Sequence, residues 1–163
     1  GQYNRIKFLA IDTDPNTFAS EKDNPFSETE YINLSMCGSK IDVNHLGEDF
    51  DWLTKNADIE QIIKSGIGAG SVRQAGRFML YDKIQLVGYR ISDMLMTGIT
   101  GYPQETRIVF YIFSGLSGGT GSGLFLDVCY LARKTITDRK LNGRIHGYFF
   151  MPDINHSVIR YSQ

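Results

Sequence analysis

The chain carries four short apolar runs, each ending in polar or glycine-rich residues, which is the pattern of β-strands. The runs are Arg5–Ile11, Tyr31–Cys37, Ile108–Phe113 and Arg144–Met151. The first alternates imperfectly between apolar and polar positions, as expected for a strand buried on both faces. The second alternates well enough for a strand at the edge of a sheet.

Three segments between these runs carry apolar residues at the helical period. Asp58–Lys64 predicts a short helix with Asp58 as its N-cap. Gln74–Thr97 predicts one long helix that Gly98 closes. Leu124–Arg133 predicts a third helix.

Strands that alternate with helices predict the α/β class, with a mainly parallel sheet flanked by helices in three layers. Ligands in such folds bind at the carboxyl ends of the strands. Four loops are expected to meet at that edge: Asp12–Asp14, Gly66–Ser71, Ser114–Gly123 and Met151–Asp153.

The segment Ser114–Gly123, SGLSGGTGSG, joins an expected strand to an expected helix. A helix N-terminus carries unpaired N–H groups and a partial positive charge, so it attracts anions such as phosphate. Glycines let the backbone approach an anion closely, and Ser117, Thr120 and Ser122 can add hydroxyl donors. The alternative interpretation is a glycine-rich turn that serves only tight packing of strand against helix.

Two common phosphate-binding motifs do not fit this segment. A P-loop requires a lysine, and Ser114–Gly123 contains none. The dinucleotide fingerprint requires G-x-G-x-x-G, whereas here the third glycine of the series that starts at Gly119 arrives one residue early. The motif therefore argues against a dinucleotide-dependent enzyme.

Composition narrows the possible partners. The chain has 163 residues, enough for one domain with a hydrophobic core, and a formal net charge of −1. This charge provides no basic field for nucleic acid, and no apolar run reaches the roughly 18 residues of a membrane span. Cys37 and Cys129 are expected to be free thiols in a reducing compartment, so we expect a cytoplasmic location. The histidines lack metal-ligand spacing, so no protein metal site is expected.

Four segments, in order along the chain, resemble the signatures of the tubulin/FtsZ-like GTPase superfamily. They are RIKFLAIDTD (5–14), GIGAGSVRQAGR (66–77), FSGLSGGTGSG (113–123) and GYFFMPD (147–153). The stretch GAGSVRQAGRFMLYDK (68–83) is most similar to divergent bacterial tubulin-like proteins. The resemblance implies a partial tubulin-like GTP-binding domain over residues 1–163. The family's first phosphate loop, core helix and C-terminal domain are expected to be absent from it.

The resemblance also implies a site for GTP or GDP at the expected sheet edge. The loop before the long helix would close over the terminal phosphate. Asp153 would contact the ribose or, alternatively, be an ordinary turn aspartate. Asp12 and Asp14 would order Mg²⁺ through water or, alternatively, cap a turn. The candidate nucleotide-binding residues are Asp12, Thr13, Gly68, Ala69, Gly70, Ser71, Ser117, Gly118, Gly119, Thr120, Gly121, Ser122 and Asp153.

Arg73 and Arg77 follow the same loop. One interpretation is that they neutralise the charge of a phosphate or of an adjacent subunit. The other is that they form a solvated helix face.

The function that the resemblance implies is guanine-nucleotide binding in a filament-forming GTPase. Family members stack head to tail through the nucleotide edge, and hydrolysis requires an acidic loop that is not found in these residues. The chain alone is therefore expected to be inactive, and no catalytic residue is assigned. The alternatives are a non-hydrolysing nucleotide-binding interaction module and, less favoured, a dinucleotide-dependent oxidoreductase.

Overall fold

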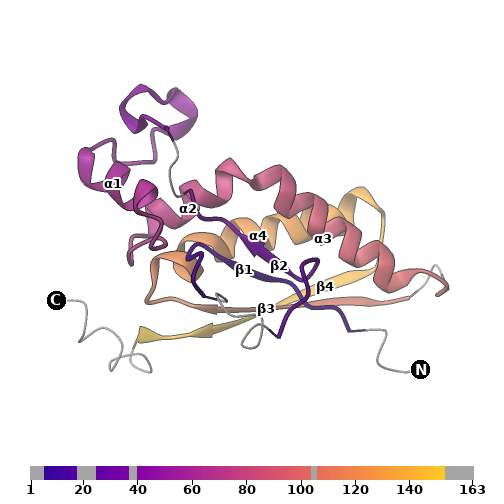
Figure 1. The fold of residues 1–163 in the computed structure, drawn as a ribbon. Coiled ribbons are helices and arrows are strands. Elements are labelled where there is room, and N and C mark those ends of the chain that lie inside the picture. The colour runs from indigo at the N-terminus through magenta and orange to yellow at the C-terminus, as the bar shows by residue number, and fades with distance from the viewer. Residues whose placement is uncertain (1–5, 18–24, 37–39, 104–105, 153–163) are drawn as a thin grey trace.

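The computed structural model describes residues 6–17, 25–36, 40–103 and 106–152. Helices α2, α3 and α4 lie on one side of strands β3 and β4 (Figure 1). The elements in chain order, with η for 3₁₀-helices, are β1 (Ala10–Asp12), β2 (Tyr31–Asn33), η2 (Val43–His45), η3 (Glu48–Phe50), α1 (Ala57–Ser65), α2 (Arg73–Asp82), α3 (Ile84–Ile99), β3 (Ile108–Gly115), α4 (Gly119–Asp138) and β4 (Gly143–Phe150).

The strands pair in parallel, as the sequence predicts. β1 pairs with β2 in one two-stranded sheet, and β3 pairs with β4 in another. The second pair is matched along its whole length, from Ile108 opposite Gly143 to Gly115 opposite Phe150. The α/β class and the parallel pairing are confirmed, and within the described residues the strands form two separate pairs.

β1 and β2 are shorter than the apolar runs that predict them. The Ala10 N–H donates to the carbonyl of Glu30 at 2.7 Å, and the Leu34 N–H donates to that of Asp12 at 2.7 Å. These two bonds bracket the short ladder between the strands. Apolar residues outside it, such as Leu9, pack against the core without strand pairing.

The N-cap of α1 is Asn56, so the prediction of Asp58 was wrong. The Asn56 side-chain oxygen accepts the N–H of Ile59 at 2.9 Å. Asp58 lies in the first turn, where a carboxylate favours the helix through its dipole. Both residue types cap helices well, so the sequence alone did not separate them.

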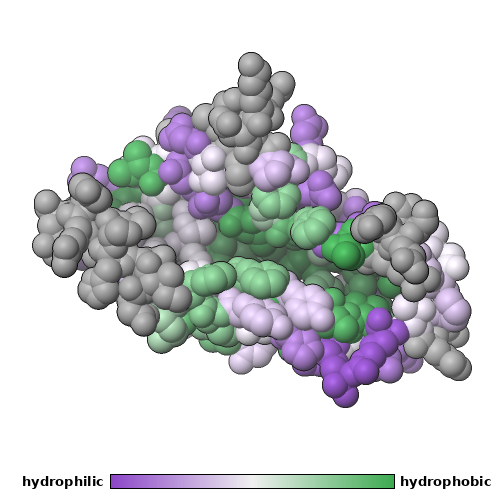
Figure 2. Space-filling view, turned by 90° about the horizontal axis from the view of Figure 1, so that it is seen from below, coloured by the Kyte–Doolittle hydropathy of each residue, from purple (hydrophilic) through white to green (hydrophobic). Residues whose placement is uncertain are grey.

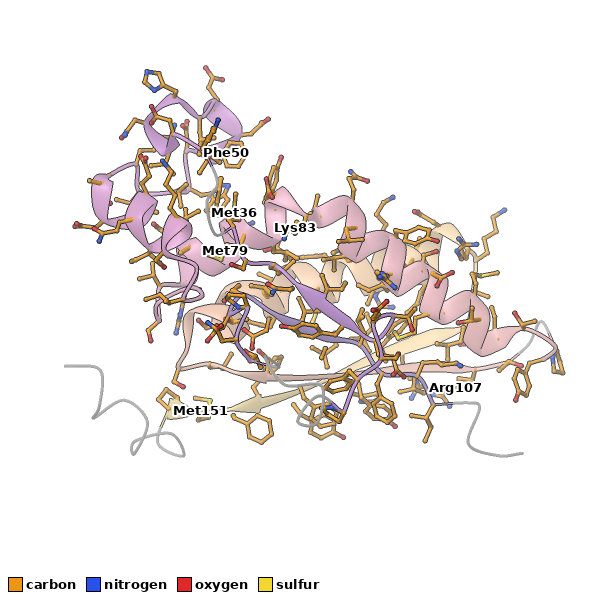
Figure 3. The ribbon with its side chains drawn as sticks, viewed as in Figure 1. Met36, Phe50, Met79, Lys83, Arg107 and Met151 are labelled. Carbon is orange, nitrogen blue, oxygen red and sulfur yellow. The ribbon has the colours of Figure 1, made fainter. Side chains whose placement is uncertain are left out.

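The predicted single helix over residues 74–97 is divided at Lys83 into α2 and α3. Lys83 has a non-helical backbone, with φ −111° and ψ 20°. Its ammonium donates to the carbonyls of Asn33 (3.0 Å), the last residue of β2, and Ser35 (3.1 Å), two residues later. Lys83 lies at the junction of the two helices (Figure 3). This long-range tether explains a break that the apolar period does not show.

α4 starts at Gly119, well before the predicted start at Leu124, and includes three glycines in its first turns. It ends in a Schellman motif with Lys140 at φ 53°. The N–H of Lys140 donates to Thr137 O and that of Leu141 to Ile136 O.

The hydrophobic core joins β2 to the helices. Met36 and Met79 belong to it, and Phe50 packs against it, at the end of the molecule where α1 and α2 lie (Figure 3). The largest fully buried side chains are Phe78, Leu34, Ile63, Met79, Leu80, Val43, Val87 and Thr13.

β3 and β4 are covered by helices on one face only, within the described residues. Phe110 packs against the core on that face. The opposite face is apolar and exposed, and the rings of Phe113 and Tyr148 stack on it with centroids 5.0 Å apart. Figure 2 shows apolar side chains gathered on the face seen from below. The described residues thus supply two of the three expected layers.

Two expectations from composition can be compared with the structure. Cys129 is free and half-buried, and this burial raises the pKa of its thiol. Cys37 lies outside the described residues. None of the helices in the described ranges has the length and apolar character needed to cross a membrane.

Candidate functional site

The turn after β1 is organised by the carboxylate of Asp12. One oxygen accepts the N–H groups of Thr13 (2.6 Å) and Asp14 (3.2 Å). The other accepts the hydroxyl of Thr17 at 2.8 Å. This is the geometry of a turn-capping aspartate, one of the two roles that the sequence left open.

Thr13 connects this turn to two distant loops. Its side chain is fully buried, and its hydroxyl oxygen lies 2.5 Å from that of Thr120 in the first turn of α4. The same oxygen accepts the N–H of Ala69 at 3.0 Å. Thr120 also donates to Asp12 at 3.3 Å. Three of the four predicted loops therefore meet at the carboxyl edge of the strands.

The loop before α2 has a backbone that favours glycine. Ala69 at its centre is 3 % exposed, whereas Gly70 and Ser71 are exposed. The Val72 N–H donates to the Ala69 carbonyl at 2.8 Å, which closes the loop. Positive φ angles occur at Gly66 (74°), Gly68 (85°), Gly70 (54°) and Ser71 (60°). A non-glycine residue at such an angle is strained, and strain of this kind is frequent at functional sites.

Most glycines at the start of α4 are required for packing. A Cβ at Gly119 would lie 2.7 Å from both the Ala69 Cβ and the Val72 nitrogen. One at Gly121 would collide with the Gly115 carbonyl, and one at Gly123 would lie 2.5 Å from the carbonyl of Arg73. The packing interpretation of the glycine-rich turn thus holds for these three positions.

Gly118 is different. A Cβ there would meet no atom within 4 Å, and its backbone is extended, with φ −89° and ψ 167°. It is the N-cap of α4, and no side chain caps the helix. Ser122 does not serve this purpose, since its hydroxyl donates back to the Gly118 carbonyl. The first N–H groups of α4 thus have neither an intrahelical acceptor nor a capping side chain.

The N-terminus of α2 lies against that of α4. A Cβ on Gly76 of α2 would collide with the Gly119 carbonyl, and Gly119 also lies close to Val72, the N-cap of α2. No side chain caps α2 either. Two partially positive helix ends therefore lie at one place, where an anion would be stabilised.

The two arginines of α2 differ in their partners. Arg77 donates to both carboxylate oxygens of Asp127 on α4, at 2.9 and 3.4 Å, and lies 4.6 Å from the ring centre of Trp52. Arg73 donates to the carbonyl of Leu116 at 3.4 Å. The contacts of Asp127 and Trp52 with Arg77 could not be predicted from the sequence, because both residues lie far from Arg77 in the chain and belong to no motif.

A family model described as tubulin-like matches residues 1–163, the whole chain. The chain belongs to the tubulin-like family. Comparisons with curated proteins and with solved structures gave no match. The resemblance carried by the four sequence segments is therefore confirmed at the level of the family.

The fourth loop of this tubulin-like chain is only partly described. The Leu116 N–H donates to the carbonyl of Phe150 at 2.9 Å, so the end of β4 lies beside the turn that leads into α4. Asp153, the expected ribose contact, lies outside the described residues. Ser117 is half-buried in the same turn.

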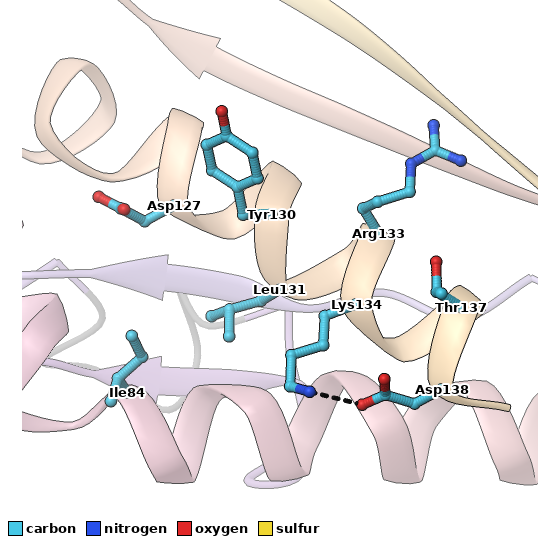
Figure 4. A pocket seen from close by; sticks show the side chains of 8 residues that line it. All are labelled: Ile84, Asp127, Tyr130, Leu131, Arg133, Lys134, Thr137 and Asp138. Carbon is cyan, nitrogen blue, oxygen red and sulfur yellow. Dashed lines mark hydrogen bonds and ion pairs between the residues drawn. The ribbon is translucent and has the colours of Figure 1, made fainter.

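An open groove of about 420 Å³ runs between α3 and α4 of the tubulin-like domain. Lys134 and Asp138, which line the groove, form an ion pair with 2.7 Å between Nζ and Oδ2 (Figure 4). Its lining residues are Ile84, Asp127, Tyr130, Leu131, Arg133, Lys134, Thr137 and Asp138. None of them belongs to the three loops that meet at Thr13, so the groove is separate from the candidate site.

Proposed function

We propose that this chain is the guanine-nucleotide-binding domain of a filament-forming GTPase of the tubulin-like family. One observation carries the proposal: three loops meet where α4 begins uncapped and Gly118 faces open space. Uncapped helix N-termini beside glycines bind phosphate. The family resemblance supports guanine as the base and Mg²⁺ as the accompanying ion, and a cytoplasmic location belongs to the same proposal.

The candidate residues divide into two groups in this proposal. Gly118 and the first N–H groups of α4 contact the phosphates. Thr13, Ala69 and Thr120 hold the loops together instead, since their polar groups bond one another. Asp12 likewise serves the turn.

The proposal is tested by titrating the protein with GTP, GDP and ATP in a calorimeter, comparing the wild type with Gly118→Val. The Cβ of the new side chain meets no protein atom within 4 Å, and we expect the side chain to block the approach of a phosphate. We expect GTP affinity to fall at least about tenfold, equivalent to about 1.4 kcal/mol. The melting temperature should not change.

Gly47→Val is the matched control. Gly47 is also extended, a Cβ on it also meets no atom within 4 Å, and it precedes η3, outside the three loops. Gly119 and Gly121 are unsuitable, because their substitution would push apart packed backbone. Equal GTP affinity in the Gly118 and Gly47 variants would remove the support for a phosphate site at α4.

The second candidate is a nucleotide-binding module without hydrolysis. The carboxylate of Asp12, which bonds residues of these loops, already accepts four hydrogen bonds. It is therefore poorly suited to activate water, and this favours the module. Phosphate release by the full-length protein in the presence of GTP distinguishes the two candidates, since this chain alone is expected to be inactive under both. Release that rises with protein concentration favours the assembled GTPase, whereas GTP binding without release at any concentration favours the module.

A further inference from the structure

Arg73 brings a positive charge to the place where the two helix N-termini meet. It is the first residue of α2, and its side chain crosses to the turn between β3 and α4. There it donates to the Leu116 carbonyl at 3.4 Å, which is long for such a bond. Leu116 lies two positions before Gly118, the residue that faces open space.

No carboxylate in the part of the chain that the structure describes balances the charge of Arg73. Within the described ranges Arg73 forms no ion pair, whereas Arg77 on the next turn of α2 is held by Asp127. A guanidinium on one long bond to a neutral carbonyl can turn to an anion at little cost. A charge-assisted bond to phosphate would be shorter and stronger.

The surroundings of Arg73 also favour an anion. Neither α2 nor α4 has a capping side chain, and both present partial positive charge at the same place. Residues 114–123 contain no lysine or arginine, so a phosphate bound at Gly118 has no cation within its own loop. Arg73 supplies that missing charge from the neighbouring helix.

We propose that the Arg73 guanidinium binds the terminal phosphate of a nucleoside triphosphate and sets the preference of the site for triphosphate over diphosphate. This inference rests on the proposed nucleotide-binding function. The helix N-termini and glycine backbone suit any phosphate, whereas an unpaired guanidinium discriminates by charge and geometry. A triphosphate carries the additional charge that Arg73 can pair.

The test is calorimetric titration of GTP and GDP into the wild type, Arg73→Gln and Arg133→Gln. Arg133 is an exposed arginine on α4 that lines the groove of Figure 4, so its substitution makes the same charge change away from Gly118. We expect Arg73→Gln to weaken GTP binding roughly tenfold or more, and GDP binding by less than about threefold. Arg133→Gln should leave both affinities unchanged.

The outcomes separate this inference from the function on which it rests. A wild type that binds neither nucleotide contradicts the proposed function itself. A wild type that binds, with equal losses for GTP and GDP or no loss in Arg73→Gln, overturns only the role of Arg73. A melting temperature lowered in Arg73→Gln but not in Arg133→Gln, together with equal losses of GTP and GDP affinity, assigns Arg73 to holding Leu116 instead.

Discussion

The Thr13 hydroxyl joins three loops that are distant in sequence, and its removal should therefore cost more than the loss of most buried hydroxyls. Thr13→Val keeps the shape of the side chain but leaves the Ala69 N–H without its acceptor. We expect the free energy of unfolding to fall by about 1–3 kcal/mol, measured by urea denaturation. Thr120 retains Asp12 as a partner.

Thr135→Val provides the control for Thr13→Val. Thr135 is also buried, but its hydroxyl donates to the Leu131 carbonyl of its own helix, and among the described residues it joins no other element. Its loss should therefore change stability by less than about 0.5 kcal/mol. A double-mutant cycle with Thr120→Val isolates the contact between the two hydroxyls. The double variant should lose less than the sum of the single losses, and strict additivity would contradict a shared bond.

At the level of single residues, the sequence predicted which loops meet better than it predicted the contacts that their residues make. Placing the loops at the carboxyl ends of parallel strands was sufficient to bring Thr13, Ala69 and Thr120 together. No local sequence pattern indicated that the polar groups of these residues would form hydrogen bonds with one another. The ion pair of Arg77 with Asp127 likewise depends on how α2 crosses α4, which tertiary packing decides.

At the level of elements, the end of α4 offers a test of backbone strain. Lys140 occupies the left-handed position of the Schellman motif, where a side chain costs about 1–2 kcal/mol relative to glycine. Lys140→Gly should raise the free energy of unfolding by about 0.5–1 kcal/mol, after allowing for the greater freedom of glycine in the unfolded chain. Lys134→Gly, within the same helix, should lower it by about 1 kcal/mol. Equal effects of the two substitutions in urea denaturation would contradict this account.

The wrong predictions for the α2–α3 break and for the start of α4 have the same cause, which is tertiary contact that local sequence patterns do not show. Apolar periodicity continues through Lys83, so the pattern predicted one helix. Hydrogen bonds from Lys83 to the carbonyls of Asn33 and Ser35, at the end of β2, divide that helix into two. Glycine disfavours helix interiors, so the start of α4 was placed after the glycines. Contact with α2 requires small residues there, and this contact outweighs the low helix propensity of Gly119, Gly121 and Gly123.

For the molecule as a whole, the alternation of strands and helices was enough to predict the α/β class. It did not predict that the strands would form two pairs, because hydrogen bonding between pairs depends on packing. Both faces of β3 are apolar, as in a parallel sheet covered on two sides, and the described residues cover one. Exposed rings on the uncovered face include those of Tyr111, Phe113, Tyr148 and Phe150.

The proposed assembly through the proposed nucleotide-binding edge can be tested at Ile67, which is 70 % exposed in the loop before α2. Head-to-tail stacking at that edge is a contact that does not close, so it produces filaments, and it would bury Ile67. We expect light scattering of the full-length protein to rise with GTP and not with GDP. Ile67→Asp should abolish this rise while GTP affinity stays within about threefold, since the substitution leaves Gly118 and the bonds of Thr13 unchanged. Leu86→Asp makes the same exchange of an exposed apolar side chain for a carboxylate, but on α3. This variant should assemble normally. Scattering that never depends on nucleotide, or an Ile67→Asp variant that assembles like the wild type, would place assembly elsewhere and favour the binding module.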